Sequence, residues 1–317
     1  MTRKRIQNKI SESRFAFPTA ALYSVFIWLA CGLLTHEWWF SFLLMIVTSY
    51  FMVEVNNQNA LIRIYSRMVS CSFLAFSVME NFLFGNNSAA ATGLCFAGFF
   101  LMFFKTYQHK DGSTPIFYAF IYLGILSFFS IQILYLLPII WILLTTKIMA
   151  WSWRNFWSSL LGIFMPYWFL EGYYIYIGKY RWIINHLMGL ISGEHLFDWT
   201  IIDIPRRISF IWLTLLALIG IIHFLTTSYK DSIKVRMFYE SFITMDIAVF
   251  LLILIFPNHY DELITIFTVS TSPIIAHYIA LTRGKVNNIV FIFIMIITLL
   301  ITIFNMTSNL WTHLFHF

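Results

Sequence analysis

Residues 52–70, MVEVNNQNALIRIYSRMVS, place a dense polar run between two apolar stretches of the chain. One acid, three Asn, one Gln and two Arg fall within these nineteen residues. A helix needs about 20 predominantly apolar residues to cross a bilayer. The stretch therefore predicts that two membrane-spanning helices meet at a short polar loop, residues 55–66, with Asn59 as the N-cap of the second helix.

The composition of the whole chain excludes a soluble protein. Hydrophobic residues make up 60% of the 317 residues and charged residues only 11%, whereas soluble domains carry about 25% charged residues. The mean hydropathy is +0.78. The three cysteines, Cys31, Cys71 and Cys95, lie in apolar stretches with no metal-ligand spacing, so the sequence predicts no disulfide framework, no metal site and no cofactor.

Apolar length read against polar breaks predicts an all-α polytopic membrane protein with about eleven spans. The fifth and sixth predicted spans are nearly contiguous, so ten spans would also fit the pattern. The predicted spans are residues 15–35, 37–54, 67–84, 88–105, 114–130, 131–146, 155–177, 208–228, 239–257, 262–282 and 286–306.

The distribution of basic residues predicts how these spans are threaded. With the N-terminus placed inside, sixteen of the 20 Lys and Arg residues fall in inner segments, which is the asymmetry that cytoplasmic loops carry. No small-residue cleavage site follows the first apolar run, so a signal peptide is not predicted. The predicted organisation is a basic cytoplasmic tail 1–14, membrane helices 15–177, an outer loop 178–207, membrane helices 208–306 and an outer tail 307–317.

The long outer loop contains an amphipathic pattern near residues 180–192. Trp182, Ile183, Leu187, Leu190 and Ile191 recur at helical spacing, which predicts a helix lying on the membrane surface.

Three stretches carry a resemblance to a known family. NNQNALIRIYSRM (56–68), FYAFIYLGILSFFSIQILYLLPIIWILL (117–144) and SWRNFWSSLLGIFMPYWFLEG (152–172) resemble a family of uncharacterised polytopic inner-membrane proteins of Bacteroidota. The resemblance implies a bacterial inner membrane. It implies no activity and no active-site position, because the family has no assigned functional residues.

Acidic and basic residues at the predicted outer face suggest one class of function. A carboxylate beside an interfacial helix is the arrangement of enzymes that take lipid-linked sugars, in which the carboxylate acts as general base and basic residues hold phosphate. Glu37 and Glu171 are the candidate catalytic residues, and Arg206 and Arg207 the candidate phosphate ligands. This interpretation places the protein in envelope glycan or lipid assembly. The alternative is that these polar residues lie at helix ends, face water and have no specific role.

The two arginines of the opening stretch allow two interpretations. Arg63 and Arg67 are four residues apart, so on a helix they would share one face and could bind an anionic phospholipid headgroup. The alternative is a charged turn that only fixes the topology.

Three ionisable residues in the later spans suggest a different function. His223, Asp246 and His277 are each predicted to lie five to seven residues from the inner end of a span. The sequence predicts an Asp246–His277 hydrogen bond with His223 nearby, either as the proton site of a small transporter or as a buried polar pair that fixes helix packing. No internal repeat typical of transporters is present.

A non-catalytic membrane scaffold with membrane-protein partners is the third interpretation, since the spans hold few polar residues. Whether the protein is an enzyme stays open. Nucleic acid is not a predicted partner, because the basic inner segments account for the net charge of +6 and no Gly-rich phosphate loop is present. The lipid bilayer is the predicted environment.

Overall fold

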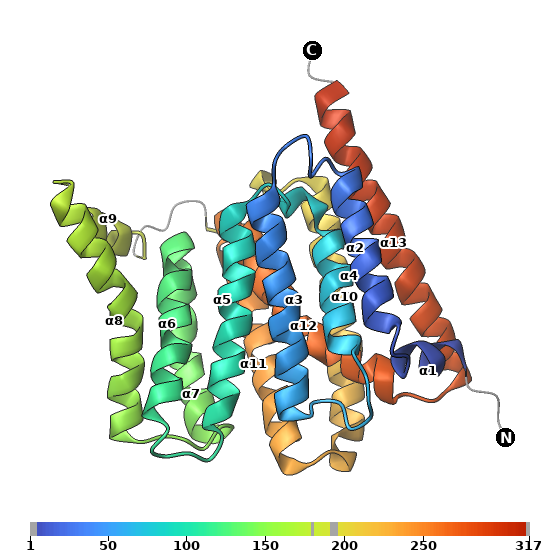
Figure 1. The fold of residues 1–317 in the computed structure, drawn as a ribbon, viewed down its shortest axis with the longest axis horizontal. Helices are drawn as coiled ribbons and strands as arrows, with labels where there is room; N and C mark the ends of the chain where they lie inside the picture. Colours follow the sequence, from blue (N-terminus) through green and yellow to red (C-terminus); the bar gives the residue numbers. More distant parts are fainter. Residues whose placement is uncertain (1–4, 179–180, 191–195, 315–317) are drawn as a thin grey trace.

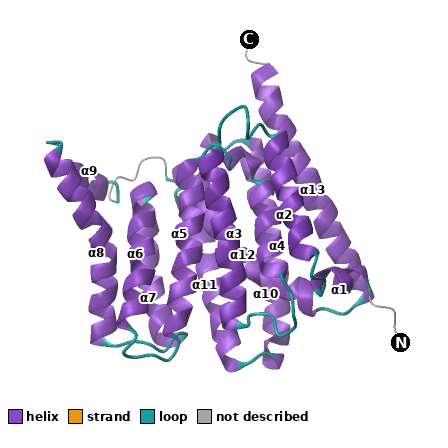
Figure 2. Cartoon of the chain, viewed as in Figure 1, coloured by secondary structure: helices purple, strands orange, loops and turns teal. Residues whose placement is uncertain are grey.

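The computed structural model describes residues 5–178, 181–190 and 196–314, and within these ranges it contains helices and no strand (Figures 1 and 2). Most helices run side by side as one bundle (Figure 1). The α-helices are α1 (Ile6–Ser11), α2 (Ala16–Ala30), α3 (Trp39–Asn59), α4 (Met68–Met79), α5 (Asn87–Phe103), α6 (Ser113–Phe129), α7 (Leu137–Thr146), α8 (Trp153–Tyr176), α9 (Trp182–Met188), α10 (Ile204–Thr227), α11 (Ile233–Ile255), α12 (Tyr260–Leu281) and α13 (Lys285–Leu314). Short 3₁₀ turns include η1 (Asn81–Leu83), η3 (Ile131–Leu136), η4 (Trp199–Ile201), η5 (Ser228–Lys230) and η6 (Pro257–His259).

The length and composition of these helices are consistent with a helical membrane protein. Among the described residues, six helical segments are long and apolar enough to cross a bilayer. Large apolar side chains also cover the outside of the bundle, which marks a surface in contact with lipid. The six segments are Trp39–Asn59, Asn87–Thr106, Ile204–Lys230, Ile233–Ile255, Pro257–Leu281 and Lys285–Ser308.

Helices occupy the remaining predicted spans as well, but these helices are shorter or less apolar. Four described segments are apolar and have 10–17 residues: Ala16–Ala30, Met68–Met79, Ser113–Phe129 and Ile131–Thr146. In α8, Trp, Tyr and polar residues interrupt the apolar run. The fifth and sixth predicted spans form separate helices, because the backbone of Ser130 is extended between α6 and η3.

The two ends of the bundle can be told apart by the two ends of the chain. Figure 1 places α1 at one end, here called the N-terminal end, and the last turns of α13 at the other, here called the C-terminal end. Helix α13 runs to Leu314, so the predicted tail 307–317 begins inside a helix. Of that tail, residues 315–317 lie outside the described residues, as do residues 1–4 of the predicted basic tail.

Helix α12 lies at the centre of the bundle. In its most apolar stretch 94% of the residues are buried, against 33% in α13, which lies at the edge. Helices α4, α5, α10 and α11 all pack against α12. The hydroxyl of Ser272 donates to the carbonyl oxygen of Thr268 one turn back, so this polar group is satisfied within the helix.

Small residues set the closest approaches between helices. A Cβ at Gly162 of α8 would lie 2.6 Å from the carbonyl oxygen of Phe117 in α6, and a Cβ at Gly124 of α6 would lie 2.7 Å from the carbonyl oxygen of Ile163. In a bilayer the hydrophobic effect does not drive helices together, because lipid tails are as apolar as the side chains. Membrane helices therefore associate through small residues, which allow close packing of their backbones. The two glycines therefore fix how α8 packs on α6.

Helix α1 closes the N-terminal end of the bundle with its polar face inward. The Gln7 side chain donates to the carbonyl oxygen of Ile279 (2.8 Å), and the Asn8 side chain donates to that of Thr282 (3.0 Å). These bonds satisfy carbonyls at the end of α12 that have no partner within the helix. Ile6 and Ile10 are exposed on the outer face of α1, which is the orientation expected of a helix at a lipid surface.

Two glycines of α8 allow a matched test of this packing. We expect Gly162→Ala to destabilise the protein by about 1–3 kcal/mol, because the new methyl group overlaps the backbone of α6. In Gly172→Ala, on the same helix, the new methyl group meets no atom within 4 Å. This substitution should raise the stability of the protein by roughly 0.5–1 kcal/mol, because alanine favours the helix more than glycine does. Thermal unfolding in detergent measures the stability of both variants. Equal changes in their melting temperatures would contradict the close α6–α8 contact.

Candidate functional site

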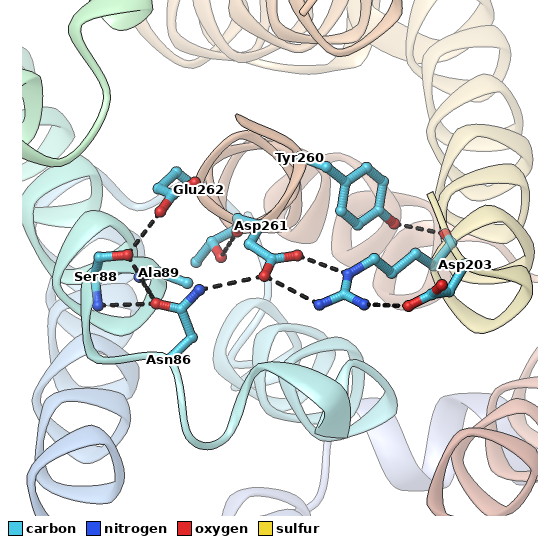
Figure 3. A network of polar contacts seen from close by, with 9 residues as sticks. Asn86, Ser88, Ala89, Asp203, Tyr260, Asp261 and Glu262 are labelled. Carbon is cyan, nitrogen blue, oxygen red and sulfur yellow. Dashed lines mark hydrogen bonds and ion pairs between the residues drawn. The ribbon is translucent and has the colours of Figure 1, made fainter. Parts of the chain in front are cut away.

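A polar cleft of about 350 Å³ lies at the C-terminal end of the bundle. It forms where η6 meets the beginnings of α5, α10 and α12, and Figure 3 shows the polar network along its wall. Its lining residues are Asn86, Ile201, Ile202, Arg206, Pro257, Asn258, Tyr260, Asp261 and Glu262.

Helix beginnings place the polar side chains of this cleft. Asn86 is the N-cap of α5, and its side-chain oxygen accepts hydrogen bonds from the backbone N–H groups of Ser88 (3.1 Å) and Ala89 (3.2 Å). Asp203 precedes α10, and Asp261 and Glu262 lie in the first turn of α12. Acidic side chains are favoured there because the first turn of a helix carries a partial positive charge.

An ion pair joins α10 to α12 across the cleft. The Nε and one terminal nitrogen of Arg206 donate to the two carboxylate oxygens of Asp261 (2.8 and 3.1 Å), and its other terminal nitrogen donates to Asp203 (2.9 Å). The Asn86 amide also donates to Asp261 (3.2 Å). Both oxygens of Asp261 and all three nitrogens of Arg206 are therefore occupied, so this pair acts as a rigid brace.

A tyrosine hydroxyl strengthens the brace. The buried Tyr260 side chain donates its hydroxyl proton to the backbone carbonyl of Arg206 (2.6 Å), so α12 holds the backbone of Arg206 as well as its side chain. Figure 3 shows Tyr260 and Asp261 reaching from α12 toward the beginning of α10.

Glu262 differs from Asp261 because its carboxylate bonds to a serine and not to an arginine. Its Oε1 lies 2.6 Å from the hydroxyl of Ser88, which lies 2.7 Å from the side-chain oxygen of Asn86 (Figure 3). The backbone N–H of Glu262 also donates a hydrogen bond to this carboxylate. Two carboxylates and one already paired guanidinium line the cleft, so its chemistry suits hydroxyl or amine donors better than a phosphate.

The carboxylates predicted from the sequence lie apart from this cleft. Glu37 is exposed in the loop between α2 and α3, where its backbone is left-handed (φ 56°). Glu171 lies on α8 with one carboxylate oxygen shielded from solvent and no hydrogen-bond partner among the described residues. Figure 1 places α8 at the edge of the bundle farthest from α2, so the structure does not bring Glu37 and Glu171 together.

Both arginines predicted to hold phosphate have protein partners. Arg206 forms the brace described above. Arg207 donates from Nε to the carbonyl oxygen of Ile202 and from a terminal nitrogen to that of Trp199, each at 2.7 Å. In this arrangement Arg207 stabilises the turn that leads into α10, and its role as a phosphate ligand stays a prediction.

The expected pairing of Arg63 with Arg67 on one helical face is wrong. Helix α3 continues to Asn59, which therefore ends this helix and does not cap the next one, and the left-handed Ala60 (φ 47°) closes it. Residues 60–67 are not helical. Arg63 donates to the carbonyl oxygen of Lys230 (3.2 Å), whereas Arg67 lies over the ring of Tyr65 (5.9 Å), so the two guanidinium groups have different partners.

The expected hydrogen bond between Asp246 and His277 is also wrong. The Nε2 of His277 lies 2.9 Å from a carboxylate oxygen of Asp231, and both side chains are almost fully buried. Asp246 instead accepts hydrogen bonds from Ser270 (2.7 Å) and Thr271 (2.8 Å). Because α11 and α12 are antiparallel, His277 lies opposite residues nearer the start of α11.

The surroundings of His277 contain further buried polar groups. The ring of His277 lies 4.7 Å from that of Tyr239 and 5.4 Å from that of His223, so the predicted proximity of His223 is confirmed. The Tyr239 hydroxyl and the Nδ1 atoms of both histidines have no hydrogen-bond partner among the described residues. A role of this cluster in moving protons stays a hypothesis. Sequence reasoning missed Asp231 because it lies in a predicted loop.

The predicted surface helix near residues 180–192 is present in part as α9. The ring of Trp182 stacks on that of His186 at 4.9 Å, and the Nε2 of His186 lies 2.9 Å from the carbonyl oxygen of Ser127 in α6. His186 therefore contacts the bundle through α6. Residues 179–180 and 191–195 lie outside the described residues.

Neither metal chemistry nor similarity to other proteins assigns a role to these sites. In the part of the chain that the structure describes, no group of three His, Cys, Asp or Glu side chains could hold a metal ion. Comparison with protein-family models, with curated proteins and with solved structures gave no match. Function must therefore be argued from the residues themselves.

A double-mutant cycle tests the brace of the cleft. We expect Arg206→Gln and Asp261→Asn each to lower thermal stability, and their effects to be coupled by about 1–2 kcal/mol because the two groups bond directly. Arg207→Gln is the control, since among the described residues Arg207 bonds to backbone carbonyls and not to Asp261, and its effect should add to that of Asp261→Asn. A coupling near zero for the Arg206 pair in detergent-solubilised protein would show that the brace does not form.

Proposed function

We propose that this protein works in envelope glycan or lipid assembly at the outer face of a bacterial inner membrane. In this proposal eleven helices cross the membrane, the N-terminus is cytoplasmic, and the cleft at the C-terminal end binds the sugar of a lipid-linked substrate. The observation that carries the proposal is the cleft itself, about 350 Å³ in volume, with the Glu262 carboxylate in its lining and outside the Arg206–Asp261 ion pair.

The orientation is supported by where the basic residues lie in the bundle. The loops of the N-terminal end contain many lysines and arginines, whereas the described part of the C-terminal end contains Arg181, Arg206 and Arg207. Cytoplasmic loops are enriched in Lys and Arg, so the N-terminal end is assigned to the cytoplasm. The basic residues of that end include Arg5, Lys9, Arg14, Arg63, Lys105, Lys110, Lys147, Arg154, Lys230, Arg283 and Lys285.

The chemistry of the cleft favours a sugar over a phosphate. Sugar hydroxyls donate hydrogen bonds, and the cleft offers the Glu262 carboxylate as an acceptor. Arg206 is already paired with two carboxylates, so we assign the phosphate of the substrate to a place outside the cleft. Glu262 is placed to accept a proton from a bound hydroxyl, the general-base role predicted from the sequence for Glu37.

The position of Glu262 within the network suits that role. Ser88 and Asn86 hold one carboxylate oxygen through a chain of short contacts, which fixes the orientation of the group. The neighbouring Asp261 is committed to Arg206, so it supplies rigidity and not a second base. A base of fixed orientation beside an open cleft is the arrangement that proton transfer to a positioned side chain requires.

Cysteine labelling tests the orientation. In a variant with Cys31, Cys71 and Cys95 replaced by alanine, Asp203→Cys and Tyr229→Cys report the two ends of α10. Both positions are similarly exposed, at 71% and 72%. We expect a membrane-impermeant maleimide to label Asp203→Cys in intact spheroplasts and Tyr229→Cys only after permeabilisation. The reverse pattern would contradict the proposed threading.

Substrate binding tests the role of the cleft. The probe is a polyprenyl-diphosphate-linked disaccharide, and its binding to the protein in nanodiscs is measured by native mass spectrometry. We expect Glu262→Gln to weaken binding about tenfold, because a hydrogen bond to a charged acceptor is lost. Glu37→Gln, an exposed carboxylate that does not line the cleft, should bind like the wild type.

Two outcomes of this measurement count against the proposal. Equal binding by Glu262→Gln and the wild type would remove the cleft as the sugar site. A loss confined to Glu37→Gln would move the site to the loop between α2 and α3, as the sequence alone suggested.

A further inference from the structure

A second cavity, of about 340 Å³, lies near the N-terminal end of the bundle between α1, α2, α4 and α13. Its position along the helices places it in the half of the bundle opposite the polar cleft. Helix α4 forms its back wall, because α2 and α13 both pack against α4. Small side chains make the space: Ala16 and Ala20 share one face of α2, and Ala75 faces them from α4.

The cavity opens onto the surface that faces lipid. Its walls are almost entirely apolar, and Met295 and Leu299 of its lining are exposed on α13. On the same two helices, Leu22 and Phe26 of α2 and Phe293 of α13 are also exposed. A lipid chain can therefore enter sideways from the bilayer without crossing a polar barrier.

One polar group in this apolar wall has no partner. Ser72 of α4 lines the cavity, is 5% exposed, and its hydroxyl forms no hydrogen bond with the described residues. A buried hydroxyl without a partner is costly, so its position points to an acceptor supplied by a ligand. Ser72 lies four residues from the start of α4 at Met68, about 6 Å along the helix. That depth is near the boundary between headgroups and hydrocarbon, where a phospholipid carries its ester carbonyls.

Exposed basic residues adjoin the lining residues of the cavity in the sequence. Lys9 and Arg14 flank Ile10 and Ala16 of its lining, and both are exposed. The bond from the Gln7 side chain to Thr282 (2.6 Å) brings a second basic stretch, with exposed Arg283 and Lys285, to the same place. An apolar slot beneath a basic rim complements an acyl chain beneath a negatively charged headgroup.

We propose that this groove binds an anionic glycerophospholipid of the adjacent leaflet. One acyl chain fills the space between α2, α4 and α13, the Ser72 hydroxyl donates to an ester carbonyl, and Lys9 and Arg14 hold the phosphate. This site is separate from the sugar cleft in place and in chemistry, so neither proposal depends on the other.

Native mass spectrometry of the detergent-purified protein tests the proposal with defined lipids. The probes are phosphatidylglycerol, phosphatidylcholine with the same chains, and glycerol phosphate, which carries the charge without a chain. We expect phosphatidylglycerol to bind most tightly and glycerol phosphate not to compete with it. Equal binding of the two phospholipids, or efficient competition by glycerol phosphate, would overturn the proposal.

Three variants locate the site. The double variant Lys9→Ala/Arg14→Ala should bind phosphatidylglycerol ~30-fold more weakly, because two surface charges are lost. Ser72→Ala should weaken binding severalfold, and Ala20→Phe, which fills the groove, should abolish it.

Matched controls separate the groove from general lipid contact. Lys105→Ala/Lys110→Ala removes two exposed charges at the same end, and Leu22→Phe enlarges a side chain of α2 that faces lipid; both should bind normally. Unchanged binding by Ala20→Phe in folded protein would refute the groove. If Ala20→Phe does not fold, the double variant Lys9→Ala/Arg14→Ala, which changes two exposed residues, still tests the proposal. Unchanged binding of phosphatidylglycerol by this double variant would refute the headgroup contacts.

Discussion

Burial of α12 among four other helices is the constraint on which the rest of the structure depends. The middle of this helix carries four hydroxyl residues and Pro273, a sequence that would leave polar groups facing hydrocarbon on an exposed helix. In the bundle, Thr268 donates to the buried Glu80, and Ser270 and Thr271 donate to Asp246, so the polar groups of three helices satisfy one another. An apolar neighbour in place of either acid would leave these hydroxyls to bond only to their own helix.

Each end of the same helix holds a further polar cluster. At its beginning, Asp261 and Glu262 build the wall of the cleft; at its end, His277 meets Asp231, and the carbonyl oxygens of Ile279 and Thr282 anchor α1. Because α12 is rigidly surrounded, the positions of both clusters are fixed by the packing of its middle. The positions of the side chains in both clusters therefore depend on the buried polar contacts in the middle of α12.

Hydropathy predicted where helices form, because apolar length is a local property of the chain. Pairing between helices is not local, and there the predictions failed: Asp246 and His277 lie on neighbouring helices at similar predicted depth, yet the register of α11 against α12 gives them different partners. Glu262 was missed because it marked the boundary of the predicted span 262–282, and only the fold places it beside Ser88 of α5. The brace between Arg206 and Asp261 likewise joins residues 55 positions apart, which no pattern along the chain reveals.

A count of basic residues does not locate a binding site for an anion, because a basic side chain that is already bonded to a protein group is less available to bind one. Arg206 and Lys147 form ion pairs with Asp261 and Glu240, and Arg207 bonds to carbonyl oxygens, so each of these cations already stabilises the protein. Lys9 and Arg14 are instead exposed, next in sequence to residues that line the apolar cavity. An anion that displaced a carboxylate from Arg206 would have to replace a two-point bond. Lys9, in contrast, is exposed and forms no ion pair with the described residues. The same argument assigns hydroxyl donors to the acidic cleft and a negatively charged lipid to the opposite end.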